Sequence, residues 1–129
     1  MRLQEDVLIF TELSEDKRIL PISLESISAG RKLAQAFGRR HVAVMIGNGI
    51  ADVAREMAHY AVDEVLLVDH PDLDDYQPEL YVSAFLQVCD RVKPKAILMG
   101  DTLLSLDLAP RIAFSLNRGL ITDCVGIES

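Results

Sequence analysis

The strongest constraint on the fold is a set of short, unbroken apolar runs that recur along the chain. They are Val7–Phe10, His41–Ile46, Val65–Val68 and Ala96–Met99, followed by a weaker run over Leu120–Ile127. A strand with one solvated face alternates apolar and polar residues, whereas a strand covered on both faces is apolar throughout. The runs therefore predict the buried strands of a parallel sheet.

Segments with the periodicity of amphipathic helices separate these runs. Ser23 has the chemistry of a helix N-cap, Glu25 would lie in the first turn, and Gly38 marks the end of this helix. Three further apolar stripes at helical spacing cover residues 50–61, 81–92 and 108–116. Because strand–helix–strand units pair in parallel through right-handed crossovers, we expect a single three-layer, doubly wound α/β domain over residues 1–129.

Charge and hydropathy exclude several classes of protein. The 129 residues include 20 acidic and 13 basic side chains, for a net charge of -7. This charge argues against nucleic acid or a membrane surface as a partner, because both are polyanions. No run approaches the roughly 20 apolar residues of a membrane span. The N-terminus lacks a signal-peptide pattern, and Cys89 and Cys124 fit no zinc-site spacing, so we expect a cytoplasmic location.

In an open parallel sheet, ligands bind beyond the carboxyl ends of the strands, where the strand order reverses. The loops expected at this edge are Thr11–Leu20, Gly47–Asp52, Asp69–Gln77 and Gly100–Leu106. No pair of nucleophile and base stands out in them. We therefore assign no catalytic residue.

The loop after the second run begins like a dinucleotide-binding fingerprint. Gly47 and Gly49 have the expected spacing, and Asp69 lies near the position of a ribose-binding acid. The third glycine position holds Asp52, whose carboxylate would lie close to a pyrophosphate. The sequence therefore favours an ordinary tight turn, with a dinucleotide site as the alternative.

The acidic segment that starts at Asp69 allows two other interpretations. Residues 69–75 could ligate a cation, but Pro71 interrupts the run and no calcium-loop pattern appears, which favours a solvated connection. Asp69 could also be the phosphate acceptor of a receiver domain. Such domains need paired acids after the first strand and a late lysine, whereas Glu12 stands alone there and no lysine follows Lys95.

The segment after Gly100 is the most informative one. Proline fits the first turn of a helix, where its missing N–H costs nothing, so Pro110 predicts a helix capped by Asp107. Thr102 and Asp107 would then line the mouth of the crevice, and Arg111 would lie one turn into the helix.

These residues belong to an ordered set of motifs that resembles one known family. The set comprises Ile19–Glu25 with Gly30–Ala34, Val44–Gly47, Glu64–Val68, Gly100-x-Thr102-x-x-x-x-Asp107-Leu108-x-Pro110-Arg111, and Ile121-x-Asp123-Cys124-x-Gly126. It looks like the N-terminal domain of the electron-transfer flavoprotein alpha (large) subunit, over nearly the whole chain. The chain departs from the usual Gly-Arg of that family at Ser105 and Leu106, which puts an arginine contact at the domain or subunit boundary in doubt.

The resemblance implies a Rossmann-like fold of the adenine-nucleotide-hydrolase type with strand order 3-2-1-4-5. It implies a heterodimer that shuttles electrons from flavin dehydrogenases to an acceptor oxidoreductase. This domain would be the scaffold that packs on the small (beta) subunit, with Thr102, Asp107 and Arg111 as candidate switch-point or subunit contacts. FAD would lie in a C-terminal domain beyond Ser129, and AMP or a second FAD in the small subunit. The domain itself would hold no cofactor and no metal.

The alternative is a stand-alone adenine-nucleotide-binding domain of the universal-stress type. Such a domain would bind phosphates at the Gly47–Asp52 turn and the Gly100–Leu106 loop. Its usual glycine-rich phosphate loop is absent from this sequence.

Overall fold

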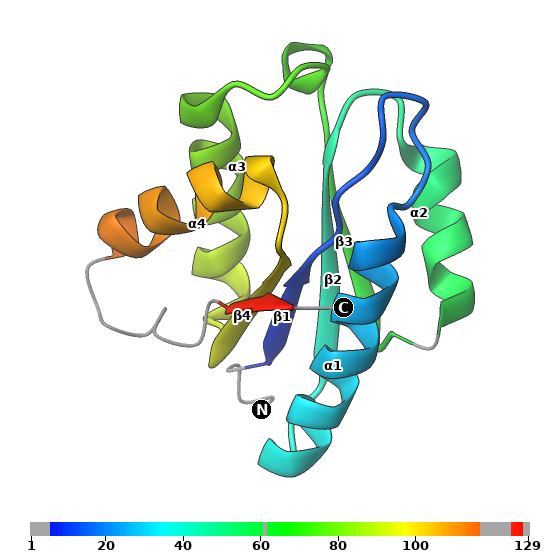
Figure 1. Cartoon of the computed structure of the whole chain (residues 1–129), viewed down its shortest axis with the longest axis vertical. Coiled ribbons are helices and arrows are strands. Elements are labelled where there is room, and N and C mark those ends of the chain that lie inside the picture. The colour runs from blue at the N-terminus through cyan, green and yellow to red at the C-terminus, as the bar shows by residue number, and fades with distance from the viewer. Residues whose placement is uncertain (1–5, 61, 117–124, 128–129) are drawn as a thin grey trace.

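The computed structural model, which describes residues 6–60, 62–116 and 125–127, contains a five-stranded parallel sheet (Figure 1). Its strands are β1 (Val7–Phe10), β2 (His41–Gly47), β3 (Glu64–Asp69), β4 (Ala96–Gly100) and β5 (Val125–Ile127). The order is β3-β2-β1-β4-β5, as expected, and all neighbouring strands pair in parallel. Residues 120–124 of the expected fifth strand lie outside the described residues.

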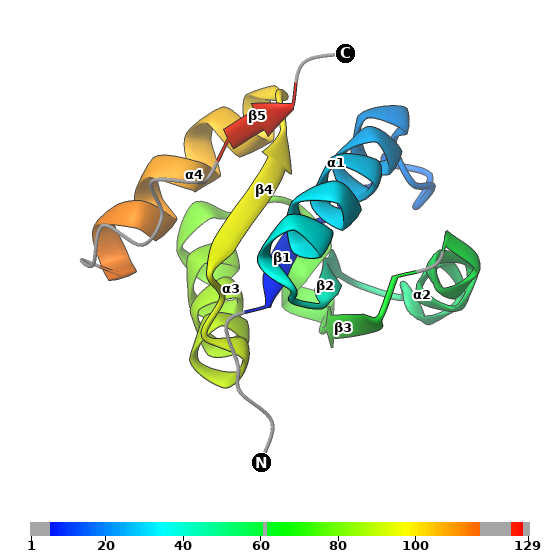
Figure 2. The same ribbon diagram turned by 90° about the horizontal axis from the view of Figure 1, so that it is seen from below.

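Helices cover both faces of this sheet (Figure 2). They are α1 (Pro21–Phe37), α2 (Ala51–Met57), α3 (Pro78–Val92) and α4 (Leu103–Leu116), with short 3-10 turns at Ala58–Tyr60 and Pro71–Leu73. Successive residues of β1 face opposite layers, since Ile9 packs in the cluster that includes α1 and α2 and Phe10 in the cluster with α3 and α4. Helices α1 and α2 thus lie on one face of the sheet, and α3 and α4 lie on the other. The direction in which successive strands are added reverses between β1 and β4, which is the switch point of the sheet. None of the described helices is long and apolar enough to cross a membrane.

The beginning of α1 differs from the expectation. The helix starts at Pro21, and Ser23 is its third residue rather than its cap, while Glu25 lies beyond the first turn. Proline fits the first helical position because its φ is already helical and the N–H there has no helical partner. The Ser23 hydroxyl instead accepts the Glu12 N–H at 2.8 Å and donates to the Glu12 carbonyl at 3.1 Å. Ser23 thus ties the loop after β1 to α1.

The beginning of α4 also corrects the sequence analysis. Thr102, and not Asp107, caps this helix, because its Oγ1 accepts the Ser105 N–H at 3.1 Å and its carbonyl accepts the Leu106 N–H at 2.8 Å. Asp107 therefore lies inside the helix, and so does Pro110. Because Pro110 has no N–H, the helix lacks one backbone hydrogen bond there, and the cap at Thr102 stabilises the longer helix.

The other helix boundaries follow the sequence pattern more closely. Gly38 ends α1 in the left-handed conformation (φ 67°), as predicted. Helix α2 ends at Met57 and continues as a 3-10 turn to Tyr60, and α3 begins at Pro78, before the apolar stripe that was expected from Tyr81.

Gly100 brings α1 and the end of β4 together. A Cβ atom built at this position would lie 2.7 Å from Cγ1 and 3.0 Å from Cγ2 of Ile22. These separations are shorter than van der Waals contact, so only glycine allows Ile22 to pack here without rearrangement. This close approach fixes the N-terminal turn of α1 beside the switch point.

Candidate functional site

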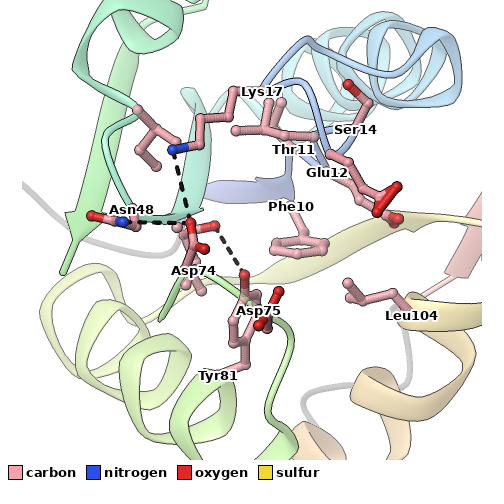
Figure 3. A pocket seen from close by; sticks show the side chains of 15 residues that line it. Phe10, Thr11, Glu12, Ser14, Lys17, Asn48, Asp74, Asp75, Tyr81 and Leu104 are labelled. Carbon is pink, nitrogen blue, oxygen red and sulfur yellow. Dashed lines mark hydrogen bonds and ion pairs between the residues drawn. The ribbon is translucent and has the colours of Figure 1, made fainter. Parts of the chain in front are cut away.

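A cavity of about 270 Å³ lies beyond the carboxyl ends of β1 and β2 (Figure 3). Phe10, Tyr81 and Leu104 supply apolar surface from β1, α3 and α4, so the cavity touches both sides of the switch point. Parts of all four expected loops line it, through Glu12, Asn48, Asp74 and Leu104. The topology rule therefore located the cavity correctly.

The charge of this cavity is strongly acidic. Four carboxylates line it, from Glu12, Glu15, Asp74 and Asp75, against the single ammonium of Lys17. The Lys17 Nζ lies 3.8 Å from Asp74 Oδ1, so this cation already faces a carboxylate. Phosphate groups would meet net repulsion here. The sequence analysis missed this cluster, because Glu12 and Asp74 are distant in the chain and only the folded sheet brings them together.

Two backbone donors of the Gly47–Asp52 turn are bonded to the Asp69 side chain. The carboxylate of Asp69 accepts the Gly49 N–H at 2.7 Å and the Ile50 N–H at 3.1 Å. A pyrophosphate on a dinucleotide fingerprint would need such backbone donors. Asp69 thus serves the chain's own turn, and the geometry matches the tight turn that the sequence favoured.

In the acidic segment after β3, a backbone amide also bonds to a side chain of the same segment. The His70 Nδ1 accepts the Asp72 N–H at 3.0 Å. Among the residues that the structure describes, no three His, Cys, Asp or Glu side chains form a group that could hold a metal ion.

Thr102 lies at the switch point and joins its two sides. Its hydroxyl donates to Glu12 Oε1 at 2.6 Å, which links the start of α4 to the loop after β1. Because Ser23 already bonds to the Glu12 backbone, Glu12 is held from α1 and from α4 at once. The crevice where a related fold would bind a ligand is therefore bridged by protein.

Asp107 and Arg111 lie together on α4, away from Thr102. Asp107 Oδ2 accepts the Tyr76 hydroxyl at 2.6 Å and the Arg111 Nε–H at 3.1 Å. The hydrogen bond from Tyr76, followed by that from Arg111, lowers the pKa of Asp107. Burial, and then the hydrogen bond to Asp107, raises the pKa of Tyr76. Through the Tyr76–Asp107 hydrogen bond, this cluster joins the segment before α3 to α4.

The outer side of α4 carries the most exposed large apolar side chains of the described residues. Leu103 is 86% exposed, Leu106 63% and Phe114 87%, whereas the other exposed large apolar residues lie at 38–39%. With Pro110, these residues fall on one side of the helix, opposite the buried Leu108 and Ile112. We call Leu103, Leu106, Pro110 and Phe114 the outer face of α4. Sequence analysis missed it because a helix starting after Asp107 excludes two of its members.

Comparisons with known proteins give a consistent family. Residues 7–129 match the family model described as the electron transfer flavoprotein domain. The chain is 36% identical over 124 residues to the electron transfer flavoprotein subunit alpha of Thermoanaerobacterium thermosaccharolyticum, which is 96% of this chain and 37% of that protein. It is also 36% identical over 123 residues to the acryloyl-CoA reductase electron transfer subunit beta of Anaerotignum propionicum, which is 95% of this chain and 33% of that protein.

A third relative belongs to an enzyme complex. The chain is 35% identical over 111 residues to the lactate dehydrogenase (NAD(+),ferredoxin) subunit LctC of Acetobacterium woodii, which is 86% of this chain and 27% of that protein. The chain thus spans about a third of the length of these relatives. None of these matches favours a stand-alone domain of the universal-stress type, and the family match covers all the described strands and helices. The chain belongs to the electron transfer flavoprotein family.

Proposed function

We propose that the chain is the N-terminal scaffold domain of the alpha (large) subunit of a heterodimeric electron-transfer flavoprotein. The observation that carries this proposal is the family match over residues 7–129, which includes every described strand and helix. In the proposed protein, FAD lies in a C-terminal domain beyond residue 129, and the small (beta) subunit holds AMP or a second FAD. The complete heterodimer carries electrons from flavin dehydrogenases to an acceptor oxidoreductase in the cytoplasm.

The geometry of the carboxyl edge supports a scaffold rather than a cofactor site. The cavity of about 270 Å³ lies at the lower limit of pockets for drug-sized ligands, which run from about 300 to 1,000 Å³. Four carboxylates line it, and the Gly49 and Ile50 amides of the turn bond to Asp69. Thr102 and Glu12 bridge the switch point. These features leave little that could bind a dinucleotide.

This arrangement also supports a domain that performs no catalysis itself. In the part of the chain that the structure describes, the polar groups at this edge bond chiefly to each other: Thr102 to Glu12, Tyr76 to Asp107, and the Gly49 amide to Asp69. Placement of the flavin domain and of the small subunit is then the contribution of this domain. Any reaction with a dehydrogenase requires the complete subunit pair.

The experiment is a flavin-retention assay on the purified chain. The chain is incubated with excess FAD and desalted, and its visible absorption spectrum is recorded. We expect no retained flavin absorbance, because the cavity at the carboxyl edge of the sheet is small and lined by four carboxylates. Flavin retained near one equivalent would contradict the scaffold assignment and would place a flavin site at the Gly47 and Gly100 loops. The same chain, co-expressed with the small subunit from its own genome, should form a heterodimer.

A further inference from the structure

We propose that the outer face of α4 is the surface on which the small subunit docks, through an apolar patch surrounded by basic side chains. This inference rests on the proposed heterodimer and specifies where on the chain the contact forms. It is carried by the composition of α4, by the exposure of its outer face and by the charges at the edge of that face.

Helix α4 is apolar on both sides. Its inner side buries Leu108 and Ile112 against the sheet, and its outer face exposes Leu103, Leu106 and Phe114. A helix that covers one face of a sheet normally presents polar residues to water, whereas a helix that is apolar all round is buried on all sides. The sequence of α4 therefore fits a helix with a second covering layer.

The size of the outer face fits a specific interface. At their observed exposures, the three side chains present on the order of 400 Å² of apolar surface, which approaches the nonpolar part of one side of a standard interface of about 800 Å² per partner. A groove beside them is lined by Val82, Pro110 and Phe114 and could receive a side chain of the partner. A patch of this size matches the largest apolar patch of a typical monomer, about 300–600 Å², which is often functional.

The one charged pair in α4 can be covered without leaving a lone charge. Asp107 accepts both Arg111 nitrogens, at 3.1 and 3.3 Å, and also the Tyr76 hydroxyl at 2.6 Å. A buried charge is costly chiefly when its partner is missing, and here each charge keeps its partner. Docking on the outer face would therefore not separate opposite charges.

The charges around the outer face of α4 favour a different subunit over a second copy of this chain as its partner. Glu79 and Arg111 line the groove beside Phe114, Arg111 is paired with Asp107, and the exposed Asp101 precedes the first turn of α4. Three carboxylates thus stand against one guanidinium at the edge of this face. Two copies meeting through this face would bring acidic rims together, on chains that each carry a net charge of -7. Like charges across an interface oppose association, whereas basic residues around an apolar centre complement this rim. The small subunit is thus expected to present lysine or arginine around an apolar patch.

The test measures the affinity of the full chain for the cognate small subunit by calorimetry. Phe114→Ser should raise Kd at least tenfold, because an aromatic side chain near the centre of an interface contributes strongly to binding. Glu79→Lys should weaken binding by severalfold and reverse its dependence on salt. Phe37→Ser is the matched control: Phe37 is 38% exposed at the end of α1, in the other helix layer, and its replacement should leave Kd within twofold. Thermal unfolding of each variant checks that it is folded.

Each result has a separate meaning. A tight complex whose Kd is the same for Phe114→Ser as for the native chain would overturn the α4 surface and leave the heterodimer intact. Failure of the native chain to bind the small subunit at all would overturn the proposed function together with this inference. Self-association of the native chain that Phe114→Ser abolishes would show that a second copy, and not the small subunit, covers the face.

Discussion

Asp69, Glu12 and Asp107 each bond to groups of the chain itself, although their positions at the carboxyl edge of the sheet resemble those of ligand-binding residues. Asp69 holds the Gly49 turn, Glu12 bonds to Thr102, and Asp107 bonds to Tyr76. The sequence indicated which loops would meet, because parallel strands end at one edge. It could not indicate these partners, because each pair joins residues that are far apart in the chain.

The Asp107 cluster gives a pH-dependent prediction at this scale. Because its pKa is lowered in the folded chain, Asp107 contributes stability that is complete above the ordinary carboxylate range and is lost as pH falls through the lowered pKa. Asp107→Asn should therefore be less stable than the native chain at pH 7, with the difference closing below about pH 4, near the pKa of an unperturbed aspartate. Urea unfolding across this range measures it.

The matched variant for this test is Tyr76→Phe, which removes the first cause of the lowered pKa. The two substitutions should be non-additive in a double-mutant cycle, since each removes the charge-assisted hydrogen bond between the Tyr76 hydroxyl and the Asp107 carboxylate. A difference between the native chain and Asp107→Asn that stays constant from pH 7 to pH 2 would contradict the assigned role of the carboxylate.

Among the elements, strands were easier to predict than helix ends. Three of the apolar runs became the fully buried strands β1, β2 and β4, because burial on both faces leaves an unbroken apolar pattern. The run at Val65–Val68 also became a strand, but the prediction that it is buried was wrong: β3 lies at the edge of the sheet and its residues are only partly buried or exposed. Several neighbouring residues can each cap the start of a helix, and the local sequence does not show which of them does. Helix α1 starts at Pro21 rather than after Ser23, and Ser23 bonds to Glu12 instead. Helix α4 is capped by Thr102 rather than by Asp107, and Asp107 bonds to Tyr76 instead. Those partners could not be read from the local sequence.

The contact between α1 and β4 provides a prediction for this scale. Gly100→Ala should lower the free energy of unfolding by about 1–3 kcal/mol, the usual cost of overpacking, because the new methyl group would overlap Ile22. Ile22→Ala in the same chain should recover part of that loss by making room for the methyl group. Denaturant unfolding of the two single variants and the double variant measures this coupling. If the double variant loses the sum of the two single losses, the overlap is not the cause.

At the scale of the whole molecule, the acidic charge and the hydrogen bond that bridges the switch point both disfavour the binding of anionic ligands. The net charge of -7 and the four carboxylates of the cavity both oppose polyphosphate ligands. We therefore expect no heat of binding when the purified chain is titrated with AMP, ATP or NAD. A saturable signal for AMP and ATP would support a stand-alone nucleotide-binding domain, and one for NAD would support the dinucleotide interpretation of the Gly47 turn.

The pairing of β1 on both its edges has a consequence for the folding of the chain. Val7 pairs with His41 on one side and with Ala96 on the other, and the Thr102–Glu12 hydrogen bond joins residues 90 positions apart. Closing the longer loop costs more chain entropy, so we expect β1 to pair with β2 before it pairs with β4. Helix α4 follows β4 in the chain, so we expect α4 to dock on the sheet only after β4 has paired with β1. We therefore expect a ribosome-bound nascent chain to present the outer face of α4 in its folded position only after the central strand has gained its second neighbour.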